Sequence, residues 1–133
     1  MCGFRFYAEI SKEGKDQNGH QKQNQDISLI YLNIGNISGF NLFGVLDGHG
    51  LHGHLVSKFC KDYFISQLND FASQCKNENY STPELIYNKL KFSNFDFIRN
   101  CFKNADNAMT QQFQFEYNFS GTTCSLVIQL KKI

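Results

Sequence analysis

The amino-acid sequence predicts a single α/β domain of the α+β type, in which an antiparallel sheet packs against helices. The order of patterns along the chain is the first reason. Strand-like segments come first, helical segments follow and one strand-like segment closes the chain, without the alternation typical of a parallel sheet. Composition is the second reason, because 41% of the 133 residues are hydrophobic and 15% are aromatic, which is enough for a globular core. This length corresponds to one domain, residues 1–133.

The N-terminal part of the chain predicts three strands. Residues 4–10, FRFYAEI, alternate apolar and polar side chains with the period of a half-buried strand. A polar loop over residues 11–25 leads to an apolar strand at Ile27–Leu32. Leu42–Leu46 follows as a short buried strand, and we expect these two strands to pair as a hairpin. Asp47 then falls at the strand end.

The periodicity becomes helical after the next turn. Apolar residues recur at helical spacing over Leu55–Leu68, and Gly53 marks the entry to this helix. We expect a loop over residues 69–80.

Two further helices and a closing strand complete the predicted elements. Pro83 suits a first helical position, and Ser81 and Glu84 have the spacing of a capping box around it. A longer helix is predicted over residues 98–113, with one apolar face formed by Ile98, Phe102, Ala105, Met109 and Phe113. Residues 122–130, TTCSLVIQL, are rich in β-branched and apolar side chains and predict the last strand.

Charge and cysteine content exclude several classes of function. Thirteen Lys and Arg residues balance twelve Asp and Glu residues, giving a net charge of +1, so we expect neither a nucleic-acid partner nor an anionic membrane. The chain start has no basic segment followed by a long apolar one, so no signal peptide or membrane span is predicted. Five scattered cysteines without a C-x-x-C pair predict reduced thiols and a cytoplasmic location. These are Cys2, Cys60, Cys75, Cys101 and Cys124.

Three polar clusters mark predicted strand ends. They are NQD at residues 24–26, DGHG at residues 47–50 and SGTT at residues 120–123. An Asp-Gly pair alone is a common turn signal, but three such clusters at strand ends indicate a functional site. Mg²⁺ and Mn²⁺ prefer oxygen ligands, and the carboxylate of Asp47 with the carbonyl of Gly48 offers that pair.

Other interpretations of these clusters are weaker. His49, His52 and His54 invite a zinc site, but no fourth ligand lies at a familiar spacing. Cys124 lies in an apolar strand without a basic neighbour in sequence, which is typical of a small core residue rather than a nucleophile. The hydroxyls of SGTT are more simply explained as a turn and the entry to a strand.

The clusters together resemble a known family, the metal-dependent protein serine/threonine phosphatases of the 2C type. The resemblance rests on NQD, FGVLDGHG at residues 43–50, GLHGHLVSKF at residues 50–59 and FSGTTC at residues 119–124, all in the family's order. It covers nearly the whole chain but corresponds only to the N-terminal half of the family's catalytic domain. It implies an αββα sandwich and hydrolysis of phosphoserine and phosphothreonine by a water that two Mg²⁺ or Mn²⁺ ions activate.

The resemblance also implies roles for single residues. Asp47 would bridge the two ions, with Gly48 contributing its carbonyl, and His49 would act as the general acid toward the leaving alkoxide. Gln25 stands where many members have Glu, so it can hold a metal-bound water without adding charge. Asp26 would be a second acid next to the metal site.

Two departures from the family pattern limit these expectations. Gln21 stands where the family has a phosphate-binding Arg or Lys, and the adjacent Lys22 could compensate only as a point charge. The family's later Asp-Gly and Asp-Asn motifs are missing, so the chain is expected to be truncated, inactive alone and unable to hold two ions. The sheet would then carry an open edge for the missing half or another protein partner. The alternative is an inactive phosphatase-like structural or interaction module in a larger assembly.

Overall fold

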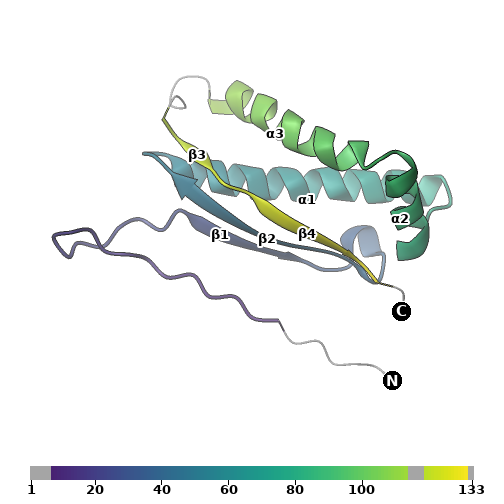
Figure 1. Ribbon diagram of the computed structural model, residues 1–133, viewed down its shortest axis with the longest axis horizontal. Helices are drawn as coiled ribbons and strands as arrows, with labels where there is room; N and C mark the ends of the chain where they lie inside the picture. Colours follow the sequence, from purple (N-terminus) through teal and green to yellow (C-terminus); the bar gives the residue numbers. More distant parts are fainter. Residues whose placement is uncertain (1–6, 114–118, 132–133) are drawn as a thin grey trace.

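A four-stranded antiparallel sheet covered on one face by helices forms the part of the chain that the structure describes (Figure 1). The structure is a computed structural model and describes residues 7–113 and 119–131. The strands are β1 (Asp26–Tyr31), β2 (Phe40–His49), β3 (Gly121–Thr122) and β4 (Ser125–Leu130). This architecture confirms the predicted α+β class.

β2 is the central strand because it pairs on both sides. β1 pairs with one edge of β2, and β4 and β3 pair in succession with the other edge, all antiparallel. The predicted hairpin is therefore confirmed, although β2 extends beyond Leu42–Leu46 at both ends. The turn between β1 and β2 contains a short 3-10 helix, η1 (Ile34–Asn36), which begins after Asn33 in the left-handed conformation.

The helices follow the predicted order with changed bounds. α1 spans Gly53–Asn77, so the loop predicted over residues 69–80 is wrong in its first part. The reason is packing, because Phe71, Ala72 and Cys75 are buried against the core and keep the helix regular. Gly53 begins the helix as expected.

α2 (Pro83–Phe92) and α3 (Asp96–Phe113) complete the helical layer. Pro83 occupies the first turn as predicted, but the N-cap is Thr82 rather than Ser81, and its hydroxyl accepts a hydrogen bond from the Leu85 amide at 3.3 Å. The buried face of α3 consists of Cys101, Ala105 and Met109, while the predicted face residue Phe102 remains 41% exposed.

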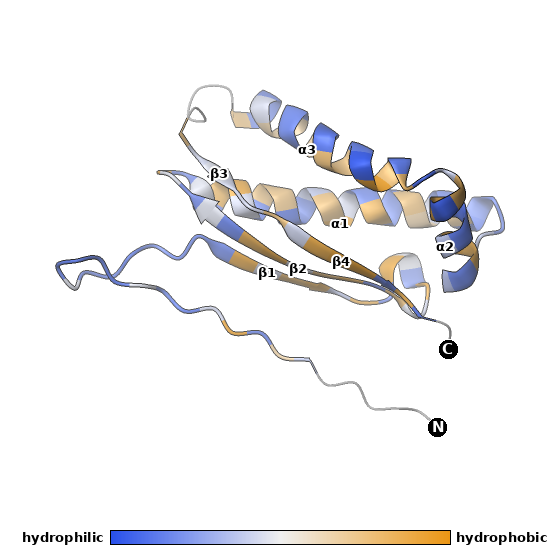
Figure 2. Ribbon diagram, in the orientation of Figure 1, coloured by the Kyte–Doolittle hydropathy of each residue, from blue (hydrophilic) through white to orange (hydrophobic). Residues whose placement is uncertain are grey.

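The core lies between the sheet and the helices. Leu29 in β1 and Leu42 and Leu46 in β2 point toward α1 and are almost completely buried. Figure 2 shows hydrophobic residues along the strands and in the helices that cover the sheet, and hydrophilic residues along the loop before β1. The opposite face, called the outer face below, carries Ile30, Phe43, Val45 and Val127, of which Val45 and Val127 are more than half exposed.

The strand predicted at residues 4–10 is not present in its described part. Tyr7–Ile10 runs along the outer face without entering the sheet ladder, and Ile10 is 93% exposed (Figure 1). A hydrogen bond of 2.7 Å from the Ser28 hydroxyl to the Glu9 carboxylate ties this segment to β1. An alternating segment becomes a strand only where it pairs along the edge of another strand, and this segment lies against the outer face instead of along the free edge of β1. Residues 4–6 lie outside the described residues.

Candidate active site

Most of the predicted site residues, namely Gln25, Asp26 and residues 47–49, lie at one end of the sheet, where β1 begins and β2 ends. Asp26 and Asp47 are direct partners in the antiparallel register. Because side chains alternate along a strand and paired residues share a face, both carboxylates project from the outer face. Both residues are exposed. We call this end of the sheet, with Gln25, Asp26 and residues 47–50, the acidic edge.

The SGTT segment closes the acidic edge from the other side of β2. Gly48 pairs with Thr122 and His49 pairs with Gly121. The Thr123 amide donates a hydrogen bond of 2.8 Å to the Asp47 carbonyl, and the Asp47 amide donates one of 3.3 Å to the Thr123 hydroxyl. Both backbone polar groups of Asp47 are thus held by one residue, which fixes the direction of its side chain.

Glycine at position 121 gives the His49 side chain its place. A Cβ at this position would lie 2.7 Å from Cε1 and 2.8 Å from Nε2 of the imidazole. His49 therefore lies over β3 and is exposed. An exposed imidazole at the end of β2 is accessible to a bound molecule, with which it could exchange a proton.

Gln25 connects the start of β1 to the turn after β2. Its side-chain amide donates a hydrogen bond of 2.9 Å to the Gly50 carbonyl. Its backbone carbonyl accepts a hydrogen bond of 3.2 Å from the Gly48 amide. Its side-chain oxygen Oε1 is buried and has no hydrogen-bond partner among the described residues. A buried amide oxygen without a partner is costly, so a water molecule or a polar ligand at this position would lower the free energy of the site.

Gln21 and Lys22 lie in the loop before β1, which folds back on itself. Gln21 forms a bridge with Lys15, and its side chain donates a hydrogen bond to Glu13. The Lys22 amide donates a hydrogen bond of 2.9 Å to the Gly14 carbonyl. The pKa of Asp16 in the same loop is lowered, mainly by a hydrogen bond from the His20 amide and in smaller part by the charge of Lys22. The role of Gln21 and Lys22 in phosphate binding remains a prediction.

Ser57 is not among the predicted site residues, yet it is fully buried beneath the acidic edge. Its hydroxyl oxygen lies within 3.0 Å of the Gln25 carbonyl, the Gly53 carbonyl and the Thr122 hydroxyl. One signal was available in the sequence, because Ser57 has helical spacing to Cys60 and Phe64, which belong to the apolar stripe of α1. A polar residue on such a stripe needs buried partners.

Burial argues against a nucleophilic cysteine at this site. Desolvation, with a smaller contribution from the neighbouring Cys60, raises the pKa of the Cys124 thiol to about 11. Desolvation likewise raises the pKa of Cys60 to about 11. Both residues are free thiols, and at neutral pH they are protonated.

The donor atoms at the acidic edge match Mg²⁺ or Mn²⁺ in kind but not in number. Asp26 and Asp47 supply carboxylates, and Gly48 and Gln25 can supply neutral oxygens, which hard cations prefer. Within the described residues, however, no group of three or more His, Cys, Asp or Glu side chains could hold a metal ion. The described residues therefore do not fit a complete site for two divalent ions.

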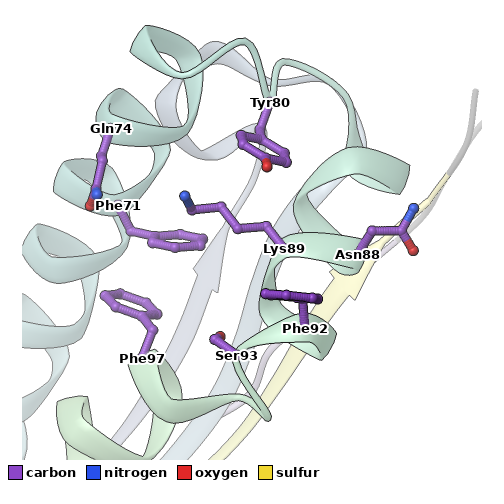
Figure 3. Close-up of a pocket in the computed structure, with 8 residues that line it drawn as sticks. All are labelled: Phe71, Gln74, Tyr80, Asn88, Lys89, Phe92, Ser93 and Phe97. Carbon is purple, nitrogen blue, oxygen red and sulfur yellow. The ribbon is translucent and has the colours of Figure 1, made fainter.

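A hollow of about 550 Å³ lies away from the acidic edge, at the corner where α1, α2 and α3 meet (Figure 3). Phe71 stacks on Phe97 with 4.2 Å between ring centroids. Lys89 reaches between the helices to the Tyr80 ring and pairs with Glu78. None of the predicted site residues lines this hollow.

Comparisons with known proteins found relatives that are named as probable phosphatases. No family model matches the chain, and no solved structure matches it significantly. The chain is 29% identical to "Probable protein phosphatase 2C 75" of rice, Oryza sativa subsp. japonica, over 84% of its own length and 32% of that protein. It is 25% identical to "Probable protein phosphatase 2C 35" of Arabidopsis thaliana, over 92% of its own length and 30% of that protein. A shorter match covers 46 residues at 46% identity, in "Probable protein phosphatase 2C 6" of Arabidopsis thaliana.

An α+β domain with a hairpin that brings two carboxylates together is thus similar to several curated phosphatases over most of its length. Its similarity to proteins named as probable phosphatases 2C amounts to 23–29% identity over 84–92% of the chain. The chain spans between about a quarter and a third of the length of the relatives that it matches over most of its own length. The described residues contain no helix long and apolar enough to cross a membrane.

Proposed function

We propose that this chain supplies part of the catalytic domain of a metal-dependent protein serine/threonine phosphatase. The observation that carries the proposal is the register of the hairpin, which sets Asp26 opposite Asp47 at the end of the sheet. The similarity to curated proteins named as probable phosphatases supports the same substrate class, phosphoserine and phosphothreonine in proteins.

In this proposal, each residue of the acidic edge has a separate role. Asp47 and the Gly48 carbonyl would hold divalent ions once further carboxylates complete the site, and Asp26 would add negative charge next to them. Gln25, with its unpaired buried oxygen, orients a water molecule. His49 gives a proton to the leaving alkoxide of the substrate. When bound, Mg²⁺ or Mn²⁺ ions supply an acidified water molecule as the nucleophile. Lys22 and Gln21 are the candidates for contact with the phosphoryl group.

Completion of the site requires further carboxylates from outside the described residues. Two carboxylates carry too little negative charge to hold two divalent ions close together. The same missing partner would cover the outer face of the sheet, whose valines at positions 45 and 127 are more than half exposed. We propose that the C-terminal half of a phosphatase domain, or a separate protein, supplies both.

Two observations favour an alternative function, a phosphatase-like module that binds other proteins without catalysis. The described residues hold no group of three metal-ligating side chains, and the neutral Gln25 stands at the acidic edge. A module of this kind would use the outer face as a contact surface and would have no Mn²⁺-dependent phosphatase activity.

The test is Mn²⁺-dependent hydrolysis of a phosphothreonine peptide by the longest protein that the reading frame encodes. We expect turnover that Asp47→Asn abolishes, because a neutral amide would bind a divalent cation more weakly than the carboxylate does. Asp62→Asn on the exposed side of α1 is the matched control and should keep full activity. Equal activity in the Asp47 variant would remove Asp47 from the mechanism, and the absence of any turnover would favour the module.

A further inference from the structure

Ser57 occupies a central position beneath the acidic edge. The side chain is fully buried, and its hydroxyl lies 2.9 Å from the Gln25 carbonyl, 3.0 Å from the Gly53 carbonyl and 3.0 Å from the Thr122 hydroxyl. These three partners come from the start of β1, the start of α1 and β3. A single hydroxyl thus joins three segments that are far apart in sequence.

Gly48 brings the DGHG turn to the same point. A Cβ at Gly48 would lie 2.5 Å from the Ser57 hydroxyl oxygen and 2.7 Å from the Gln25 carbonyl. The Gly48 backbone therefore packs directly on Ser57, and its amide donates to the same Gln25 carbonyl that Ser57 contacts. Movement of Ser57 would reach Asp47 and His49, the two neighbours of Gly48, through the backbone.

We propose that Ser57 is a positioning residue that holds the acidic edge in one geometry by joining β1, β3 and α1. The inference rests on the proposed function for its catalytic consequence, but its structural part can be tested without activity. Ser57 does not reach the outer face and does not contact substrate. It acts through the Gln25 carbonyl and the Thr122 hydroxyl, which set where the two strand ends lie.

The helix offers a matched control for this role. The Ser73 hydroxyl also donates to the carbonyl four residues earlier, that of Asn69, at 2.9 Å, but Ser73 is exposed and lies far along α1 from the acidic edge. A comparison of Ser57→Ala with Ser73→Ala therefore separates the network of Ser57 from the loss of a hydrogen bond within a helix.

Amide hydrogen exchange of the 133-residue chain, followed by NMR, tests the structural part. The Gly48 amide donates to Gln25 and the Thr123 amide donates to Asp47, so both report the acidic edge. The Tyr80 amide, which donates to the Cys75 carbonyl at 2.7 Å, is the distant reference. In Ser57→Ala we expect the first two amides to exchange about tenfold faster relative to Tyr80, and the His49 ring resonances to shift. Ser73→Ala should change neither.

Thr122 provides a second pair of variants if Ser57→Ala does not fold. Thr122→Val keeps the shape and removes the hydroxyl, whereas Thr122→Ser keeps the hydroxyl. We expect faster exchange at Gly48 in the valine variant and restoration in the serine variant. Unchanged exchange at the acidic edge in both Ser57→Ala and Thr122→Val, or a uniform change over the whole chain, would overturn the inference.

Phosphatase assays of the longest encoded protein test the catalytic part. We expect Ser57→Ala to lower kcat more than it raises KM for a phosphothreonine peptide, because the residue affects the geometry of the reacting groups. Full kcat alongside faster exchange would overturn the positioning role. If the unmodified protein has no activity, the proposed function fails, while the exchange result still decides whether Ser57 holds the acidic edge.

Discussion

Asp26 and Asp47 illustrate, at the scale of single residues, how a site can oppose stability. Their carboxylates face each other across an antiparallel pair, where like charges destabilise the sheet. We expect Asp47→Asn to raise the unfolding free energy of the 133-residue chain without metal by up to about 1 kcal/mol. Urea unfolding at low salt measures this, with Asp62→Asn as the control for a changed net charge. A lower stability of the Asp47 variant would show that its carboxylate makes a stabilising contact.

His49 should matter according to the leaving group. An alkoxide needs a proton as it departs, whereas a phenolate with a low pKa does not. In the longest encoded protein, His49→Gln should therefore slow hydrolysis of a phosphothreonine peptide far more than hydrolysis of an aryl phosphate. The ratio of the two kcat/KM values measures the effect. Equal slowing of both substrates would argue against a general acid at this position.

The buried thiols predict how stability depends on pH. Burial raises the pKa of Cys60, Cys101 and Cys124 from 9.0 to about 11. The unfolded chain loses these protons first, so the stabilisation is complete below pH 9 and is lost as the pH rises toward 11. The midpoint of unfolding should therefore decrease as the pH is raised from 8 to 11. Replacement of Cys124 by Ala should flatten the decline, and an unchanged slope in this variant would contradict the assignment.

At the scale of elements, close packing between β2 and α1 fixes the acidic edge. A Cβ on Gly48 would meet the Ser57 hydroxyl at 2.5 Å and the Gly53 carbonyl at 2.6 Å, and a backbone carbonyl cannot move without shifting its element. We expect Gly48→Ala to destabilise the chain by about 1–3 kcal/mol. Gly14→Ala is the control, since nothing lies within 4 Å of its added Cβ. Thermal unfolding of both variants measures the difference, and equal stability would refute this packing.

The elements also show which parts of the fold can be predicted from the sequence. The hairpin and the order of helices follow from local periodicity, which the printed sequence contains. The C-terminal part of α1 does not, because its Asn, Ser and Gln residues favour a loop while the burial of Phe71 and Cys75 keeps the helix intact. The strand predicted at Tyr7–Ile10 is wrong for the opposite reason. The alternation is present, but this segment pairs with no strand among the described residues.

The acidic edge was predictable in its parts but not in its assembly. The motifs identify Asp47, Gly48 and His49, and the expected hairpin places Asp26 near them. The role of Ser57 required the structure, because two of its three partners lie 32 and 65 residues away along the chain. Long-range hydrogen bonds of this kind leave no periodic pattern in a single sequence.

At the scale of the whole molecule, helices cover one face of the sheet, and among the described residues Tyr7–Ile10 runs along the outer face (Figure 1). Among the described residues, no strand pairs with the outer edge of β1 or of β4. Exposed strand edges beside an apolar face favour association with another polypeptide. The proposed second half of the phosphatase domain would cover the outer face and bring further carboxylates to the acidic edge at the same time.

Titration of Mn²⁺ into the purified 133-residue chain by calorimetry tests most directly whether the chain holds only part of a metal site. Two carboxylates and neutral oxygens do not offset the dehydration of two divalent ions. We therefore predict no saturable binding at micromolar concentrations of a folded sample. Saturable binding of two ions per chain, lost in Asp47→Asn, would contradict this account and show that the acidic edge is already a complete site.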